Sequence, residues 1–264
     1  MSPAMPRLTP LVIHGYLVAV LVFIYLPIFI MMAMGFNESA HYDLPMRFSF
    51  KWYEALAGNE VLLRSGRNSL LLAAANTAVA TVFGTMAAIA FARYRVWSRT
   101  LLQILLFPSI AIPWLILGTA MLIFFYYSGI GRGLHAMLLA HVALSLPYVI
   151  IVVGARLHGF GPELEEAAAT LGATPWQTFW RITLPVIAPG VAAAALFSFG
   201  ISFDQFVTSY FLSPPGVSTL PVEIYASIRK GFTPEINAIS TIIIIVSMGL
   251  LLMVSRFYRF GGHQ

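Results

Sequence analysis

Residues 163–185 read ELEEAAATLGATPWQTFWRITLP, a polar and strongly patterned stretch in the apolar second half of the chain. Three glutamates at its start favour a helix N-terminus, where the helix dipole is positive, and Pro162 suits a first helical turn. Apolar side chains then recur at helical spacing as far as Leu171. Gly172 follows at the position of a left-handed C-cap, and Thr174-Pro175 is a typical helix start. The stretch therefore predicts two short helices that meet at a glycine elbow.

The composition indicates a membrane protein. Hydrophobic residues make up 59% of the chain and charged residues 9%, whereas soluble domains have roughly 45–50% and about 25%. The chain has no cysteine, which excludes disulfides and thiolate metal sites. Its net charge of +5 is spread over the connecting segments, which argues against nucleic-acid binding.

Six apolar segments are long enough to cross a bilayer as helices. They cover residues 11–35, 67–91, 101–127, 134–155, 190–211 and 234–257, all within a single transmembrane domain of residues 1–264. The elbow lies in the connection 156–189. Pro108 and Pro113 are expected to distort the third span, because proline removes a backbone donor. The polar segment 36–66 is either an interfacial helix around Lys51-Trp52-Tyr53 or a surface loop.

Basic residues orient the six spans, which place both termini on one side. Eight arginines share the termini's side with three glutamates, whereas seven basic residues on the other side are balanced by six acids. The arginine-rich connector 93–99 has no acid, so the positive-inside rule makes its side cytoplasmic. The elbow is on this side. The eight arginines are Arg7, Arg93, Arg95, Arg99, Arg156, Arg181, Arg256 and Arg259.

The sequence contains no catalytic motif. Its only lysines are Lys51 and Lys230, and neither belongs to a phosphate-binding loop, so the chain is not expected to hydrolyse ATP. Motifs of serine hydrolases and zinc proteases are also absent. We therefore predict no catalytic residue and no metal site.

A few polar residues interrupt the apolar spans. Asp204 is the one carboxylate inside a span away from its ends, and it is either a pathway residue or a hydrogen-bonding group between helices. On a helical wheel Asp204 and Thr208 extend the edge of a narrow polar stripe, which should line a wet path or a helix interface. His141 is interpreted as an interhelical hydrogen-bonding group, and Glu235 as a helix-end acid or a residue at a cation-attracting mouth. The stripe itself consists of Ser198, Ser202, Gln205 and Ser209.

The elbow resembles the cytoplasmic loop of bacterial ABC-importer permeases. The match consists of Glu166-Ala167-Ala168, then Gly172 after three intervening residues, Ile182 after nine more, and Leu184-Pro185. In that family the loop forms a coupling helix that sits in a groove of the ATPase and transmits its closure. The resemblance implies a type I importer fold, all-α with six transmembrane helices, and assigns ATPase coupling to Glu166, Ala167, Ala168, Gly172, Ile182, Leu184 and Pro185.

The likeness extends to the spermidine/putrescine type of permease. It is carried by the segments 51–53, 92–95, 202–207, 215–221 and 234–238. The sequence departs from that family at Pro108-Ser109, where we expect an acid after the proline. A polyamine is therefore one candidate solute, and an opine, an amino-acid-like compound or another small solute is the alternative. The candidate pathway residues are Asp204, Gln205, Thr208, Ser109 and Glu235.

The resemblance also implies partners and a location. The partners are a second homologous permease, two ATPase subunits, a periplasmic solute-binding protein and the membrane lipid, and the location is the bacterial cytoplasmic (inner) membrane. No cofactor is expected on this chain, because ATP and Mg are used by the partner ATPase. An ATP-independent channel, or a membrane scaffold that uses the elbow for docking, is the hypothesis of a different class.

Overall fold

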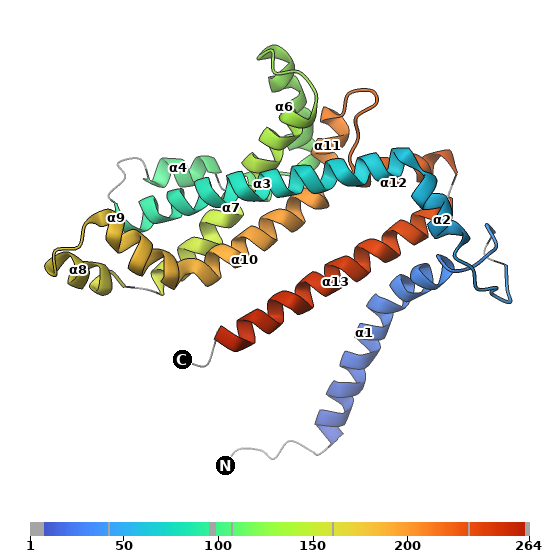
Figure 1. Cartoon of the computed structure of the whole chain (residues 1–264), viewed down its shortest axis with the longest axis horizontal. Coiled ribbons are helices and arrows are strands. Elements are labelled where there is room, and N and C mark those ends of the chain that lie inside the picture. The colour runs from blue at the N-terminus through green and yellow to red at the C-terminus, as the bar shows by residue number, and fades with distance from the viewer. Residues whose placement is uncertain are drawn as a thin grey trace. The chain divides into compact units, whose positions relative to one another are not determined.

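The computed structural model describes residues 8–41, 43–94, 99–106, 108–159, 161–231 and 233–261 (Figure 1). Arg7 and Arg95, which contribute to the predicted orientation, lie outside these ranges. The helices are α1 (Leu8–Met34), α2 (Lys51–Gly58), α3 (Glu60–Arg93), α4 (Arg99–Leu106), α5 (Pro108–Ala111), α6 (Trp114–Tyr127), α7 (Leu134–His158), α8 (Glu163–Thr170), α9 (Pro175–Thr178), η1 (Phe179–Thr183), α10 (Leu184–Phe203), α11 (Val207–Leu212), α12 (Leu220–Lys230) and α13 (Glu235–Gly261).

The fold is all-α, as the sequence predicts. Over the ranges given above, extended structure is limited to one isolated bridge between Asn37 and Phe48. Four helical runs are long and apolar enough to cross a membrane: Val12–Met34, Glu60–Arg93, Leu134–His158 and Pro175–Phe203. Two shorter apolar helices, Trp114–Tyr127 and Glu235–Gly249, lie in the third and sixth predicted spans. The count of six spans stays a prediction.

The third predicted span differs most from a single helix. Its described residues form α4, α5 and α6, and residue 107, between α4 and α5, lies outside the described ranges. Pro108 begins α5, and Pro113 is the N-cap residue of α6, with an extended backbone at ψ 131°. Pro113 has no amide proton to continue the preceding helix, so the run is broken there, as expected.

The fifth predicted span, residues 190–211, is also not one helix. Its helix begins earlier, at Leu184, and ends at Phe203, and a separate helix α11 starts at Val207. Pro189 lies inside α10 without ending it. The break falls at residues 204–206, among the polar residues of the stripe, where side chains can compete for backbone hydrogen bonds.

The chain divides into two compact units. One unit contains the chain up to Glu60 and from Ser227 onward. In it, α1 meets the start of α13, where a β-carbon on Gly35 would lie 3.3 Å from the Asn237 backbone. The carboxylate of Glu235 accepts a hydrogen bond of 2.9 Å from the Asn59 side chain, which fixes the start of α13 near the end of α2.

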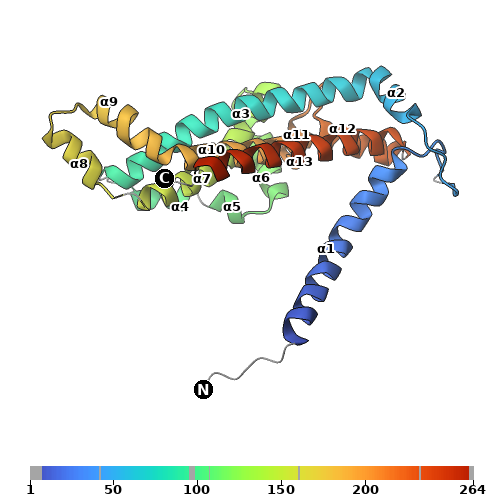
Figure 2. The same cartoon turned by 60° about the horizontal axis from the view of Figure 1, so that its bottom comes forward.

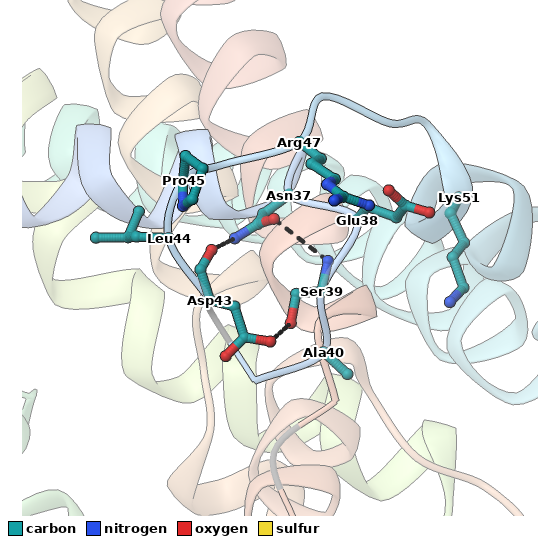
Figure 3. A pocket seen from close by; sticks show the side chains of 9 residues that line it. All are labelled: Asn37, Glu38, Ser39, Ala40, Asp43, Leu44, Pro45, Arg47 and Lys51. Carbon is teal, nitrogen blue, oxygen red and sulfur yellow. Dashed lines mark hydrogen bonds between the residues drawn. The ribbon is translucent and has the colours of Figure 1, made fainter.

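The loop between α1 and α2 surrounds a polar pocket of about 510 Å³ (Figure 3). The hydroxyl of Ser39 donates to the Asp43 carboxylate at 2.7 Å, and the Asn37 side chain donates to the Asp43 carbonyl at 3.2 Å. The indole of Trp52 donates to the Asn37 carbonyl at 2.7 Å. These contacts order the loop against α2, the helix predicted as one alternative for segment 36–66.

The other unit runs from Val61 to Ala226. Helices α7 and α10 lie side by side in both views, and α3 crosses next to them (Figures 1 and 2). A buried apolar cluster joins the three helices and consists of Ala80, Ala88, Val149, Val153, Leu157, Ile187 and Ala194. Small residues dominate the α3 side, which allows the helix backbones to approach closely.

The close approach of α3 to α7 can be tested at Gly84. A β-carbon at Gly84 would lie 2.5 Å from Val149 Cγ1, whereas a β-carbon at Gly66 in the same helix would meet nothing within 4 Å. We therefore expect Gly84→Ala to destabilise the protein by about 1–3 kcal/mol through overpacking. Gly66→Ala is the control and should be neutral or stabilising by up to about 1 kcal/mol. Thermal unfolding of the purified protein in detergent measures both, and equal stability of the two variants would contradict the packing described.

Candidate functional site

The glycine elbow has the geometry that the sequence predicts. Helix α8 ends at Thr170, and Gly172 follows with φ +86°, a left-handed conformation that favours glycine. The Gly172 amide donates to the Ala169 carbonyl at 3.0 Å, and the Ala173 amide donates to the Ala168 carbonyl at 3.0 Å. This pair of bonds is a Schellman motif, which satisfies the last carbonyls of α8 and turns the chain.

The second arm of the elbow, α9 and η1, starts with a complete capping box. The Thr174 hydroxyl accepts from the Gln177 amide at 3.3 Å, and the Gln177 side chain accepts from the Thr174 amide at 2.9 Å. Beyond α9, a single π-helical segment, η1, leads directly into α10. Pro175–Phe203 is therefore one continuous run of 29 residues. The second arm of the elbow and the membrane helix α10 are therefore parts of one helical run.

Glu165 connects α8, the first arm of the elbow, to the rest of the unit. Its carboxylate lies 2.9 Å from Arg93 Nε at the end of α3, and both side chains are mostly buried. The second carboxylate oxygen accepts a hydrogen bond of 2.7 Å from the buried Thr183 hydroxyl in η1. One carboxylate thus joins α8, α3 and the second arm. We call these three residues, Arg93, Glu165 and Thr183, the elbow latch.

The outer face of α8 is exposed and apolar. Leu164 is 54% exposed and Leu171 is 89% exposed, and the exposed Ala167 lies between them at helical spacing. Glu166 is exposed, whereas Ala168 is turned inward and buried. Exposed apolar groups in such an arrangement mark an interaction surface. The other residues of the predicted coupling set belong to the second arm, where Ile182 and Leu184 are half-buried and Pro185 is exposed.

An apolar groove of about 550 Å³ runs between α3 and the second arm. Trp176, Phe179 and Trp180 form one wall, and their rings contact one another with centroids 5.2–6.3 Å apart. The opposite wall belongs to α3 and includes Val82 and Met86. The second arm therefore presents these three aromatic residues toward α3.

A buried polar seam connects α3, α7 and α10. The side-chain amide of Asn76 donates to the hydroxyls of Ser145 and Ser198 and to the Ser198 carbonyl, each at 3.0 Å. All three side chains are fully buried. Hydrogen bonds between membrane helices contribute about 0.6–2 kcal/mol each. The stripe predicted on the fifth span therefore forms a helix interface within this chain at Ser198.

His141 connects α7 to both sides of the α10–α11 break. Its Nδ1 lies 2.8 Å from the Ser202 hydroxyl and its Nε2 lies 3.0 Å from the Ser209 hydroxyl. The three side chains are at most 3% exposed. The prediction that His141 makes interhelical hydrogen bonds is thus confirmed, and the ring uses both nitrogens.

The candidate pathway residues at the break have different surroundings. Asp204, the C-cap residue of α10, is exposed, and its carboxylate has no hydrogen-bonding or ionic partner among the described residues. Gln205 and Thr208 are buried, and their side-chain polar atoms have no hydrogen-bond partner among the described residues. Of these three residues, only Asp204 is accessible from outside the chain.

Ser109 and Glu235 each make a hydrogen bond of their own. The Ser109 hydroxyl donates to the Leu106 carbonyl at 2.7 Å. Glu235 belongs to the other unit, where it begins α13 and accepts from Asn59, as expected for a helix-end acid. Its alternative role as a mouth residue stays a prediction.

Sequence reasoning missed Asn76 and the elbow latch. Asn76 lies in the middle of the second predicted span, whereas the other asparagine, Asn68, is at its start, and an amide in the middle of an apolar helix is a usable signal for an interhelical contact. No comparable sequence signal marks the residues of the elbow latch. Its three residues are separated by up to 90 positions in the sequence, and only the turn at Gly172 brings them together.

The fold and site define a polytopic α-helical membrane protein with an exposed helical elbow continuous with a membrane helix. Residues 80–260 match the model of the family described as "Binding-protein-dependent transport system inner membrane component". The match covers more than half of the chain, so the protein belongs to this family of inner-membrane transport components. The general prediction of an importer permease is confirmed.

Similar proteins come from polyamine systems. The chain is 33% identical over 238 residues to the spermidine/putrescine transport system permease protein PotC of Escherichia coli (strain K12), with 90% of each chain covered. It is 34% identical over 251 residues to PotC of Haemophilus influenzae, covering 95% of this chain and 97% of the relative. It is 34% identical over 229 residues to the putrescine transport system permease protein PotI of Escherichia coli (strain K12), covering 84% and 82%.

Solved structures share the fold. One is a bacterial ABC transporter involved in the import of the acidic polysaccharide alginate, with a TM-score of 0.76 and 16% identity over 97% of this chain and 100% of the other. Another is the MetNI methionine ABC transporter in an inward-facing conformation, with a TM-score of 0.57 and 20% identity over 76% and 98%. The fold class is therefore that of ABC-importer permeases.

The elbow latch can be tested on its own. Glu165→Leu removes the ion pair with Arg93 and the bond from Thr183, so α8 should open more readily, with amide exchange about tenfold faster. Hydrogen exchange followed by mass spectrometry on peptides covering Glu163–Thr170 measures this change. Glu163→Gln, which alters an exposed neighbouring carboxylate, is the control. Unchanged protection of α8 in Glu165→Leu would show that the latch does not hold the elbow.

Proposed function

We propose that the chain is one permease of a binding-protein-dependent ABC importer that carries a polyamine or related amine into the cytoplasm. The observation that carries the substrate class is the 33–34% identity, over most of the chain, to permeases of spermidine and putrescine systems. Ser109 stands where we expect an acid in that family, so an opine or amino-acid-like solute is the second candidate.

In this proposal the chain works with four kinds of partner. A homologous permease completes the pathway, two ATPase subunits supply the energy from ATP and Mg, a periplasmic binding protein delivers the solute, and lipid surrounds the spans. Both termini and the elbow are cytoplasmic, which is supported by the arginine-rich connector. No nucleotide is bound by this chain, because hydrolysis belongs to the partner.

The elbow transmits ATPase closure in three steps. First, the exposed face of α8 around Leu164 and Leu171 enters a groove of the ATPase. Second, the elbow latch passes the displacement to the end of α3, while η1 passes it to α10. Third, the continuous run from Pro175 to Phe203, about 40 Å long at 1.5 Å per residue, carries the motion to Asp204. Coupling follows because packed helices move as rigid bodies.

Asp204 acts on the solute in this scheme. A carboxylate without a partner of its own, at the C-terminal and therefore negative end of α10, attracts an ammonium group. The structural alternative requires a hydrogen-bond partner, and the described residues supply none. The carboxylate therefore lowers the barrier for an arriving cation before its release to the cytoplasm.

Two elbow variants test the coupling. Glu166→Lys reverses a charge on the docking face, and Gly172→Val strains a backbone at φ +86°. Both should reduce ATP-driven uptake by about tenfold or more, without loss of the chain from the membrane. Uptake into proteoliposomes and co-purification of the ATPase are the measurements. Glu54→Lys, a charge reversal in the exposed first turn of α2, is the control. Normal uptake in both elbow variants with the ATPase bound would remove the coupling role.

The substrate role is tested with labelled putrescine and spermidine. The complete importer in proteoliposomes should accumulate at least one of them with ATP, and Asp204→Asn should lower the initial rate by about tenfold while assembly and binding-protein docking stay normal. Accumulation of neither compound would reject the polyamine assignment. Normal uptake in Asp204→Asn, together with instability of Asp204→Ala, would make the residue structural and weaken the case for a cationic solute.

A further inference from the structure

The break between α10 and α11 is anchored on both sides although the chain there is not helical. The Asp204 amide still donates to Gly200 O at 3.1 Å, and the Gln205 amide makes a long contact of 3.4 Å to Ser202 O. Helix α11 begins at Val207. Only residues 204–206 separate the two helices, so the direction of α11 relative to α10 depends on the torsion angles of these three residues.

One side chain from a different helix holds both ends of this segment. His141 of α7 contacts Ser202, two residues before Asp204, at 2.8 Å, and Ser209, five residues after it, at 3.0 Å. A neutral imidazole has one donor and one acceptor nitrogen, so one serine donates to the ring and the other accepts from it. The rigid ring therefore fixes the separation of the two hydroxyls, and with it the separation of the two helices.

The helix that carries His141, α7, is itself fixed by buried polar contacts. One turn further along α7, Ser145 is tied through Asn76 to Ser198 in α10, so α7 and α10 share two successive polar contacts. These contacts are buried, and an unpaired polar group at such a place costs about 1–3 kcal/mol. The helix α7 is thus a fixed frame, and α11 is held near it by His141, by the bond from the Gly133 amide to the Leu212 carbonyl and by the buried Leu212 side chain.

Asp204 depends on this arrangement because nothing else holds it. Its side chain is exposed and has no partner among the described residues, while its neighbours Ser202 and Gln205 are buried. The backbone of the break therefore sets the direction of its Cα–Cβ bond, and with it the region that the carboxylate can reach. We infer that His141 is a positioning residue, which directs the Asp204 carboxylate toward the solute by clamping Ser202 and Ser209. This inference rests on the proposed function of Asp204.

The first test compares single variants in the complete importer, reconstituted with its binding protein and ATPase. His141→Leu should lower the maximal rate of putrescine or spermidine uptake by about tenfold, because small displacements of a working group are costly. His141→Gln, whose amide can donate and accept, should recover part of the rate. ATP hydrolysis stimulated by the binding protein should change by less than about twofold, since the elbow is untouched. His135→Leu on the same helix is the matched control, because His135 is exposed and its hydrogen bond goes to the nearby Ile130 carbonyl and not to another membrane helix.

The second test separates positioning from packing. If His141 acts through Asp204, the double variant His141→Leu/Asp204→Asn should transport at the rate of Asp204→Asn alone. A further multiplicative loss in the double variant, or full uptake in His141→Leu, overturns the inference. If His141→Leu does not assemble, Ser202→Ala/Ser209→Ala removes both contacts without changing the histidine, and the same comparison applies.

The outcomes also separate this inference from the proposed function. Normal uptake in Asp204→Asn rejects the role of Asp204, and the role of His141 as its positioning residue is rejected with it. A loss in Asp204→Asn with normal uptake in His141→Leu and in Ser202→Ala/Ser209→Ala rejects the positioning role alone. A loss of uptake in Asp204→Asn and in His141→Leu, with no further loss in the double variant, supports both the proposed function of Asp204 and the positioning role of His141.

Discussion

The buried amide of Asn76 is the contact on which the larger unit depends. In a membrane the lipid is as apolar as the helix surfaces, so apolar burial alone does not hold helices in register. Asn76 supplies a directional bond, because its single amide nitrogen reaches Ser145 on α7 and Ser198 on α10. The close-packed small residues of α3 bring the helices near enough for this bond to form. Register along α7 and α10 then places His141 next to Ser202.

In the proposed mechanism this register connects the elbow with Asp204. The run that starts at the elbow ends next to Asp204, so the helix that would receive a displacement at one end presents an acidic residue at the other. A rigid rod transmits displacement without requiring a chain of side-chain rearrangements. The helical run ends at the break after Asp204, where His141 contacts both Ser202 and Ser209 and the Leu212 carbonyl accepts from the Gly133 amide.

The elbow shows how much local sequence determines. Its glutamates, Gly172 and Thr174-Pro175 predict the two helices, the left-handed turn and the capped start, and all of these are present. They were predictable because caps and turns depend on neighbours within a few residues. Pro113 likewise breaks the helix of the third span locally. The role of Glu165 was not predictable, since its partners Arg93 and Thr183 come from other elements.

The sequence by itself determined the all-α membrane class, the elbow and its turn, and the set of polar residues on the fifth span. The reason is that hydropathy, helix periodicity and capping are properties of short stretches. Only the tertiary structure decided that the stripe is divided by a break, that His141 spans this break, and that Asp204 faces outward while Gln205 faces inward. A helical wheel assumes an unbroken helix, and burial depends on which helices lie opposite, so these properties are set by packing between segments that are distant in sequence.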